Sequence, residues 1–344
     1  MFRRVLVPLD GSRMAERALP VAARIAYATG GTIILVRVVT SPLELQPTLT
    51  SSLPSGAIQA ILEVGRMEAS AYLRQIAASS DLQAVPTQIE VCIGQAVPMI
   101  LSVAHSRNVD LIVLSRHGQR GVTRWGVGSV AEKVVYDTWV PVLVIHGESS
   151  IPIAPGGFFH GLVPLDGSPQ AEESITPAAH LITALSEPGK GILSLMQVVR
   201  FPSSSGEQES RRNEGDPSLR EHILQETQNY LGVVVDHLEK EIAAQMRLST
   251  AWAFLSGEDV AETLLKVTEP KRTPEHGGVS SDYNLLAMTT YGRVGMRHRI
   301  VGSVTGRILR TTKLPMLIVQ PQEVSSSLRN AFAGPGAKKD TQHV

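Results

Sequence analysis

The sequence contains one seven-residue motif twice, and this repeat constrains the fold more than any other feature. Leu6–Ser12 reads LVPLDGS, and the same letters return at Leu162–Ser168, 156 residues later. A Gly-Ser-Val triplet also occurs twice, beginning at Gly128 and at Gly302, which are 174 residues apart. Self-similarity over such distances indicates a duplicated structural unit, so we expect two domains of one fold, the second with additional residues in its middle.

Composition indicates where the two copies begin and end. We expect one domain at 1–148 and a second at 158–322, joined by a linker at 149–157 that is rich in proline and glycine. The tail at 323–344 has no apolar period, and we expect it to be disordered. The additional residues of the second copy are expected to form a loop at Lys271–Ser281, where proline, glycine, serine and charged residues gather.

Within the first copy, apolar runs alternate with segments in which apolar residues recur at helical spacing. The runs predict strands, and the spaced segments predict helices between them. The expected strands are Val5–Leu9, Thr32–Val39, Gln88–Ile93, Leu111–Ser115 and Val142–Ile145, and the expected helices are Ser12–Thr29, Ile58–Ala78, Ala96–Ser106 and Val130–Asp137. Because strands that alternate with helices form parallel sheets covered on both faces, the predicted fold is an open five-stranded, Rossmann-like α/β sandwich, present twice in tandem.

Several helices carry recognisable start signals. Ser12 and Ser168 are expected N-caps, and Pro169 suits the first position of a helix. Ser129 followed by Glu132 predicts a capping box. Each signal marks the beginning of a helix that follows a predicted strand.

The overall composition argues against several classes of protein. The 32 basic residues balance the 32 acidic ones and aromatic residues make up only 4%, which disfavours nucleic-acid binding. The single cysteine, Cys92, forms neither an intramolecular disulfide nor a cysteine zinc cluster. No apolar stretch reaches the roughly 18 residues of a membrane helix, and the first apolar run is too short for a signal peptide. We therefore expect a cytoplasmic protein with no nucleic-acid or membrane partner.

The ends of the predicted strands indicate a binding site in each copy. In doubly wound sheets, ligands bind beyond the carboxyl ends of the strands. Each copy places there an Asp-Gly-Ser turn, at Asp10 and at Asp166, and a Gly-Ser pair that opens a helix, where free N–H groups favour an anion. The arginines that precede the Gly-Ser pairs suit a polyphosphate, and they are Arg120, Arg124, Arg293, Arg297 and Arg299. The same features also have structural interpretations, namely a turn aspartate, a helix cap and solvated surface charges.

Motifs for several other chemistries are missing from the sequence. It contains no P-loop, no G-x-S-x-G elbow and no H-E-x-x-H zinc helix. Gly126–Ala131 matches G-x-G-x-x-A, but Ile300 replaces Gly126 in the second copy, so we interpret the match as accidental. His117 corresponds to Tyr291, which disfavours a catalytic histidine. We therefore assign no catalytic residue and no metal ligand.

The V-P-L-D-G-S start and the turn G-x2-G-x9-G-[ST] resemble the universal stress protein family, and the chain is similar to a tandem member from Phe2 to about Pro321. The resemblance implies a sheet of the adenine nucleotide alpha hydrolase type. It also implies ATP, or another adenine nucleotide, in each domain, with Mg²⁺ or Mn²⁺ on the phosphates. At the adenosine end it implies Pro8, Asp10 and Val38, and in the second copy Pro164, Asp166 and Val198. At the phosphates it implies Gly118, Gly128, Ser129 and Val130, and in the second copy Gly292, Gly302, Ser303 and Val304.

The chain departs from the family pattern in two places. Ser115 and Thr289 stand where the family turn has its first glycine. Both residues are small and begin the turn. We therefore expect the site to be retained in each copy, with Ser115 and Thr289 as part of it. The Lys271–Ser281 insertion is expected to lie either over the second site or away from it.

Three functions are consistent with these features. The first is a nucleotide-dependent regulatory module of the stress response, the second a slow ATP hydrolase, and the third a nucleotide-free dimerisation scaffold. The glycine turn has no acidic pair to activate water, so any turnover is expected to be slow. In two-chain relatives, the resemblance implies, the last strands meet across a two-fold axis. We therefore expect an intramolecular pseudo-dimer through Val142–Ile145 and Met316–Val319, and we also consider a homodimer of the whole chain.

Overall fold

The computed structural model describes residues 1–41, 55–116, 128–146, 158–186, 188–201, 217–269, 271–272, 279–280, 283–291 and 302–322. The chain divides into two compact units, the first made of residues 1–147 and 319–344 and the second of residues 148–318. The expected linker at 149–157 and the expected tail at 323–344 lie outside the described residues. The domain boundaries and the contact expected between the two last strands stay predictions.

The first unit contains an open parallel sheet. Its strands are β1 (Arg4–Pro8), β2 (Thr32–Val39), β3 (Thr87–Ile93), β4 (Leu111–Ser115) and β5 (Val142–Ile145). They lie in the order β3-β2-β1-β4-β5, and each neighbouring pair is parallel. The helices are α1 (Arg13–Glu16), α2 (Leu19–Thr29), α5 (Ser55–Ala77), α6 (Ala96–Ser106) and α7 (Ser129–Asp137), with a 3₁₀ turn at Ser80–Leu82. The strand order reverses between β1 and β4, which is where ligands bind in sheets of this type.

The second unit repeats this arrangement. Its strands are β6 (Phe159–Leu165), β7 (Gly191–Val199), β8 (Leu248–Ser256), β11 (Leu285–Thr289) and β12 (Met316–Val319), in the order β12-β11-β6-β7-β8. The helices are α8 (Pro169–Glu172), α9 (Ile175–Leu185), α10 (Pro217–Leu238), α11 (Ala244–Met246), α12 (Val260–Thr268) and α13 (Ser303–Thr311), and a π-helical turn at Glu239–Ala243 joins α10 to α11. The prediction of two five-stranded α/β sandwiches is confirmed.

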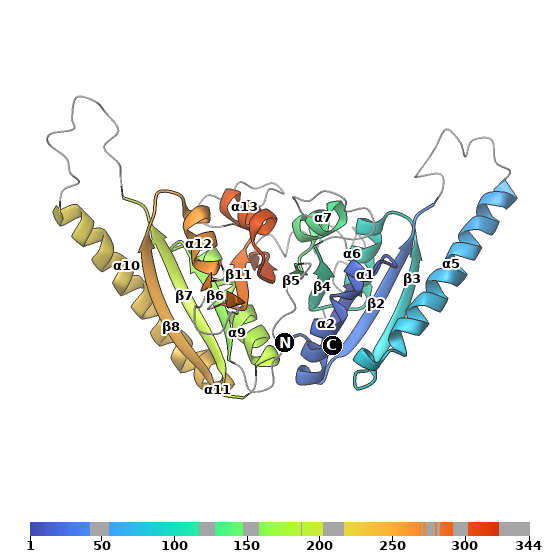
Figure 1. The fold of residues 1–344 in the computed structure, drawn as a ribbon, viewed down its shortest axis with the longest axis horizontal. Coiled ribbons are helices and arrows are strands. Elements are labelled where there is room, and N and C mark those ends of the chain that lie inside the picture. Colours follow the sequence, from blue (N-terminus) through green and yellow to red (C-terminus); the bar gives the residue numbers. More distant parts are fainter. Residues whose placement is uncertain are drawn as a thin grey trace, which may run out of the picture. The chain divides into compact units, whose positions relative to one another are not determined.

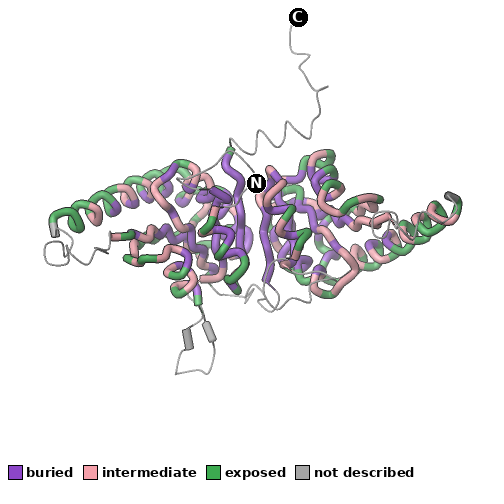
Figure 2. The backbone as a smooth tube through the Cα atoms, turned by 90° about the horizontal axis from the view of Figure 1, so that it is seen from above, coloured by how far each residue is buried: buried purple, intermediate pink, exposed green. Residues whose placement is uncertain are grey.

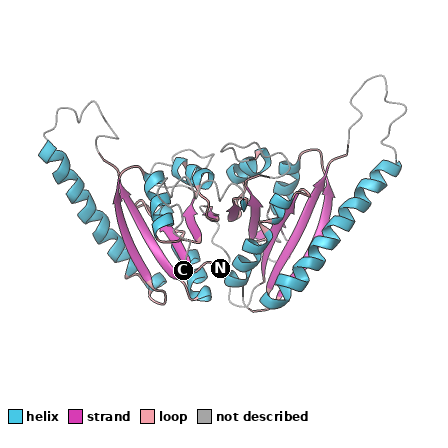
Figure 3. Cartoon of the chain, turned by 180° about the vertical axis from the view of Figure 1, so that it is seen from behind, coloured by secondary structure: helices cyan, strands magenta, loops and turns pink. Residues whose placement is uncertain are grey.

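Helices cover the sheet of each unit (Figures 1 and 3). The long helix α5 packs along β2 and β3, and α10 packs along β7 and β8 in the same manner. The right-handed crossovers of parallel strands place α6 and α7 on the opposite face from α5, and α6 packs against α7. Figure 2 shows the consequence for burial, because the central strands are buried while the outer surfaces of α5 and α10 are exposed. β4 and β11, buried throughout, are therefore continuous apolar runs apart from their last residue.

Local details differ from the sequence predictions in three places. The expected helix Ser12–Thr29 is interrupted, because α1 ends at Glu16 and α2 begins at Leu19. The predicted capping box is wrong, since Gly128 is the N-cap of α7 and the Glu132 carboxylate instead accepts a hydrogen bond from the Tyr136 hydroxyl at 2.9 Å.

The third difference lies in the insertion at 271–281, which was expected to be a loop. Its described parts form a short antiparallel pair, β9 (Lys271–Arg272) with β10 (Val279–Ser280). By contrast, the predicted N-caps Ser12 and Ser168 are confirmed, because their hydroxyls accept from Ala15 N and Ala171 N at 3.1 and 3.2 Å. Among the described helices, none is both long and apolar enough to cross a membrane.

Candidate functional site

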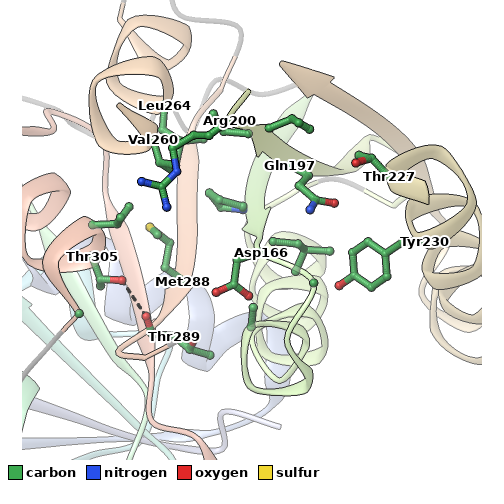
Figure 4. Close-up of a pocket in the computed structure, with 18 of the residues that line it drawn as sticks. Asp166, Gln197, Arg200, Thr227, Tyr230, Val260, Leu264, Met288, Thr289 and Thr305 are labelled. Carbon is green, nitrogen blue, oxygen red and sulfur yellow. Dashed lines mark hydrogen bonds between the residues drawn. The ribbon is translucent and has the colours of Figure 1, made fainter. Parts of the chain in front are cut away.

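A cavity of about 760 Å³ opens at the carboxyl ends of the strands in the second unit. Its floor is formed by the ends of β6, β7 and β11, and its sides come from α10, α12 and the beginning of α13 (Figure 4). It lies beside the neighbouring strands β6 and β11, where the strand order reverses. This volume falls within the range of sites for small molecules and cofactors.

The cavity brings together residues that the sequence predicted from three separate segments. One segment follows β6, a second ends β7, and the third begins at the end of β11 and continues into α13. The predicted residues in the cavity wall are Pro164, Asp166, Val198, Thr289, Gly302, Ser303 and Val304. Gly292 lies outside the described residues, as do Arg293, Arg297 and Arg299. The geometry thus unites the predicted set, whereas the binding of a nucleotide by these residues stays a prediction.

The turn after β6 is held by its own side chains. Ser168 donates to Oδ1 of Asp166 from its backbone N–H at 3.0 Å and from its hydroxyl at 2.5 Å. Gly167 between them adopts φ +82°, a conformation that favours glycine. In the first unit, Ser12 N donates to Oδ1 of Asp10 at 2.9 Å. Asp10 and Asp166 therefore share a structural role through Oδ1, and Figure 4 shows the Asp166 carboxylate directed into the cavity.

The Gly-Ser turn brings the start of α13 close to the end of β11. Gly302 N donates to the Thr290 carbonyl at 2.7 Å, and in the first unit Gly128 N donates to the Arg116 carbonyl at 2.7 Å. Both glycines adopt negative φ, −59° at Gly128 and −51° at Gly302, so backbone strain does not explain the choice of glycine. A Cβ at Gly302 would instead lie 3.1 Å from the Thr290 oxygen. The glycine thus permits a close turn that presents the first N–H groups of α13 to the cavity.

Hydrogen bonds from two threonine side chains stabilise this turn in the second unit. The Thr305 hydroxyl donates to the Thr289 carbonyl at 2.9 Å, and the Thr289 hydroxyl donates to the Tyr291 carbonyl at 2.7 Å. In the first unit, Ala131 stands where the second has Thr305, and the buried Ser115 hydroxyl has no hydrogen-bond partner among the described residues. The strand-to-helix turn is therefore stabilised by different side-chain hydrogen bonds in the two units.

Residues that the sequence analysis did not select complete the cavity wall. They include Gln197, Arg200, Glu226 and Tyr230. Tyr230 on α10 donates to Oε1 of Glu172 at 2.9 Å, and Tyr72 on α5 donates to Oε1 of Glu16 at 2.8 Å. The sequence held a signal for this repeated pair, because tyrosine and glutamate recur at nearly the spacing of the LVPLDGS motif.

The predicted residues of the first unit occupy equivalent places. Pro8, Asp10 and Val38 lie at or just beyond the carboxyl ends of β1 and β2, Ser115 ends β4, and Gly128, Ser129 and Val130 open α7. Gly118, Arg120 and Arg124 lie outside the described residues. Here Arg37 lies over the ring of Tyr72, with Cζ 4.8 Å from the ring centroid. Burial, together with the bond to Glu16, raises the pKa of the Tyr72 hydroxyl.

Comparisons with known proteins agree with the duplicated architecture. The sequence profile of the Universal stress protein family matches the chain twice, at residues 1–146 and 158–320. The chain belongs to the universal stress protein family. A universal stress protein of Mycolicibacterium smegmatis is 22% identical over 327 residues, which cover 92% of this chain and 97% of the relative. A universal stress protein of Methanocaldococcus jannaschii is 27% identical over 146 residues, which cover 42% of this chain and 82% of that protein.

Solved structures show the universal stress protein fold over nearly the whole chain. The crystal structure of a universal stress protein from Archaeoglobus fulgidus superposes with a TM-score of 0.59 at 17% identity, covering 93% of this chain and 99% of the other. A putative universal stress protein from Pseudomonas aeruginosa gives a TM-score of 0.60 at 12% identity, covering 96% and 98%. At these identities the likeness establishes the tandem fold alone.

Proposed function

We propose that each half of this universal stress protein binds one adenine nucleotide, and that occupancy of the two sites regulates the binding of protein partners. The observation that carries the proposal is the cavity of the second unit, whose wall contains all the described residues predicted for that site. Its position at the strand-order reversal matches the place where α/β sheets bind nucleotides. The equivalent residues of the first unit support a second site of the same kind.

The chemistry of the cavity wall suits the two ends of a nucleotide. The beginning of α13 supplies N–H groups and the positive end of a helix dipole for phosphates, and Arg200 adds a cation. Pro164, Val198 and Met288 supply apolar surface for a base. Among the described residues, no group of three or more His, Cys, Asp or Glu side chains is placed to hold a metal ion. A Mg²⁺ or Mn²⁺ ion is therefore proposed to enter with the phosphates.

Regulation is favoured over rapid hydrolysis by the composition of the glycine turns. The segments 115–130 and 289–304 contain no aspartate or glutamate that could activate water beside the terminal phosphate. A nucleotide held without turnover acts by shifting the population of the conformation that partners recognise.

Calorimetric titration of the full chain with ATP and Mg²⁺ tests the proposal. We expect a stoichiometry near two, together with an increase in thermal stability. Release of inorganic phosphate, measured in the same samples, is expected to be slow compared with nucleotide dissociation. Absence of binding heat and of thermal protection with ATP, ADP and AMP would contradict the proposed function.

A further inference from the structure

The two proposed sites differ at one equivalent position near the end that would hold the base. Val36 lies beside Pro8 in the β1–β2 register, and Met196 lies beside Pro164 in the β6–β7 register. The next residue along each strand is Arg37 in the first unit and Gln197 in the second. These two residues precede Val38 and Val198, the predicted adenosine-end residues.

In the first unit, the Arg37 side chain spans two walls of the site. Its Cζ lies 4.8 Å from the centroid of the Tyr72 ring on α5. Its other side faces the turn after β1, since a Cβ placed on Gly11 would lie 3.3 Å from the Arg37 guanidinium. The guanidinium is therefore held between the turn and the helix by a cation–π contact.

In the second unit, the corresponding residues line the cavity. Gly167, Tyr230 and Gln197 all line the cavity, and Figure 4 shows Gln197, Tyr230 and Asp166 around the same part of it. Gln197 is uncharged and shorter than arginine. Its buried Oε1 has no hydrogen-bond partner among the described residues, so no bond through that oxygen holds the amide in place.

We propose that this position makes the two sites unequal, with Gln197 leaving the base end of the second site open and Arg37 occupying the base end of the first. The proposal rests on the proposed binding of adenine nucleotides. A nucleotide that enters the first site has to displace the guanidinium from Tyr72, whereas the second site requires no such rearrangement. The second site is thus the high-affinity site, and occupancy of the first responds to higher nucleotide concentrations.

Reciprocal exchange of the two residues tests this assignment in the full chain by calorimetry with ATP and Mg²⁺. The wild-type chain is expected to show two classes of site that differ about tenfold in affinity, the scale of a lost cation–π contact. Arg37→Gln is expected to raise the ATP affinity of the first site to that of the second. Gln197→Arg is expected to lower the ATP affinity of the second site to that of the first. Because the two changes move the isotherm in opposite directions, they assign each class to its half.

Matched controls distinguish an effect of the position in the site from a general effect of changing the charge of the protein. Arg74→Gln makes the same substitution at an exposed position on α5, and Gln228→Arg does so at an exposed position on α10. Both controls are expected to leave the two affinities within about twofold of the wild type. Circular dichroism and thermal unfolding verify that all four variants are folded.

The outcomes distinguish the inference from the function on which it rests. Two sites of equal ATP affinity in the wild-type chain would overturn the inference while the proposed function stands. So would an Arg37→Gln variant whose first site binds ATP no more tightly than in the wild type. Weaker binding by Arg37→Gln would show that the guanidinium holds the ligand, which also overturns the inference. No binding by the wild type or any variant would overturn the proposed function and the inference with it.

Discussion

The two units share a strand order and a set of predicted binding residues, but they stabilise the site in different ways. The first unit places an arginine over a tyrosine ring beside its Asp-Gly-Ser turn, whereas the second leaves a glutamine at the edge of a cavity. The second unit stabilises its glycine turn with hydrogen bonds from Thr289 and Thr305, whereas the Ser115 hydroxyl in the first has no hydrogen-bond partner in the part of the chain that the structure describes. The duplicated fold therefore keeps the backbone of the candidate site, whereas the side chains around that backbone differ between the two units.

The largest expected effect concerns the two Gly-Ser turns, which occupy equivalent positions at the starts of α7 and α13. Gly302→Val is expected to lower ATP affinity at the second site at least about 100-fold, because the new side chain presses on the Thr290 carbonyl and displaces the helix start. Gly128→Val is expected to do the same at the first site. Calorimetry should give a stoichiometry near one for each variant.

A control for these variants is Gly232→Ala on α10, where a Cβ would meet nothing within 4 Å. It is expected to keep two sites of unchanged affinity. Circular dichroism verifies folding, and Gly302→Ala provides a milder change should the valine disturb the unit. A folded Gly302→Val chain that still binds two nucleotides with wild-type affinity would show that this turn is a helix cap only.

The next largest effect tests whether Asp10 and Asp166 have a role beyond the turn. Asp166→Asn keeps an oxygen for Ser168 but replaces the carboxylate that faces the cavity with a weaker, neutral acceptor for hydrogen bonds from the adenosine. Affinity at the second site is therefore expected to fall about tenfold with little change in Tm. Asp10→Asn should act equally on the first site. Asp236→Asn, at an exposed position on α10, is the matched control. Unchanged affinities in both variants would limit these aspartates to a structural role.

A smaller effect concerns the side-chain hydroxyls beside the two glycine turns, which form different hydrogen bonds in the two units. Thr289→Val removes the hydroxyl that donates to the Tyr291 carbonyl, and it is expected to cost about 1 kcal/mol in the free energy of unfolding. Ser115→Ala removes a buried hydroxyl that has no partner among the described residues, and it is expected to be neutral or stabilising. Urea unfolding measures both. Equal destabilisation by the two changes would remove this difference between the units.

The smallest effect concerns the helices α6 and α12, which occupy corresponding places. Asp259 caps α12 by accepting from Glu262 N at 2.9 Å, whereas Gln95 makes no side-chain cap bond to α6. The bond to Glu262 N and the ion pair with Arg307 lower the pKa of Asp259. A lowered folded-state pKa gives stability that is present above the usual carboxyl pKa and is lost as the pH falls through the folded value.

Asp259→Ala is therefore expected to lower Tm by about 1–2 °C at pH 7, with a smaller difference from the wild type as the pH falls below about 4. Gln95→Ala is expected to leave Tm unchanged at both pH values. Scanning calorimetry across this pH range checks both expectations. A Tm difference for Asp259→Ala that does not shrink in acid would show that the carboxylate charge contributes nothing to the cap.

Local signals in the sequence located some features correctly and others wrongly, and the reason differs in each case. The N-caps Ser12 and Ser168 were predictable because a cap bond spans only three residues. The capping box at Ser129 was not, because the start of α7 is set by the bond from Gly128 N to the Arg116 carbonyl, twelve residues earlier in the chain. The break after Glu16 is not visible in the apolar spacing, but Pro20, in the first turn of α2, is a sequence signal for the start of a new helix.

The residues of the candidate site likewise divide into those that the sequence identified and those that it did not. Its backbone-defined residues, such as Asp166 and Gly302, were identifiable because they recur at fixed positions after equivalent strands. Gln197 and Arg200, at the end of β7, were not selected, since the facing of a single strand-end side chain carries no repeated motif. Tyr230 was not selected either, although its pairing with Glu172 repeats that of Tyr72 with Glu16 at nearly the motif spacing.

The sequence by itself determined the duplication, the alternation of strands with helices and the family, because these depend on local periodicity and on motifs that repeat. The tertiary structure alone decided that Arg37 reaches Tyr72 in one unit while Gln197 faces a cavity in the other. The physical reason is that these contacts join residues far apart in the chain. Whether a side chain at the end of a strand fills a space or leaves it open depends on the helix packed beside it, and no periodicity in the sequence records that contact.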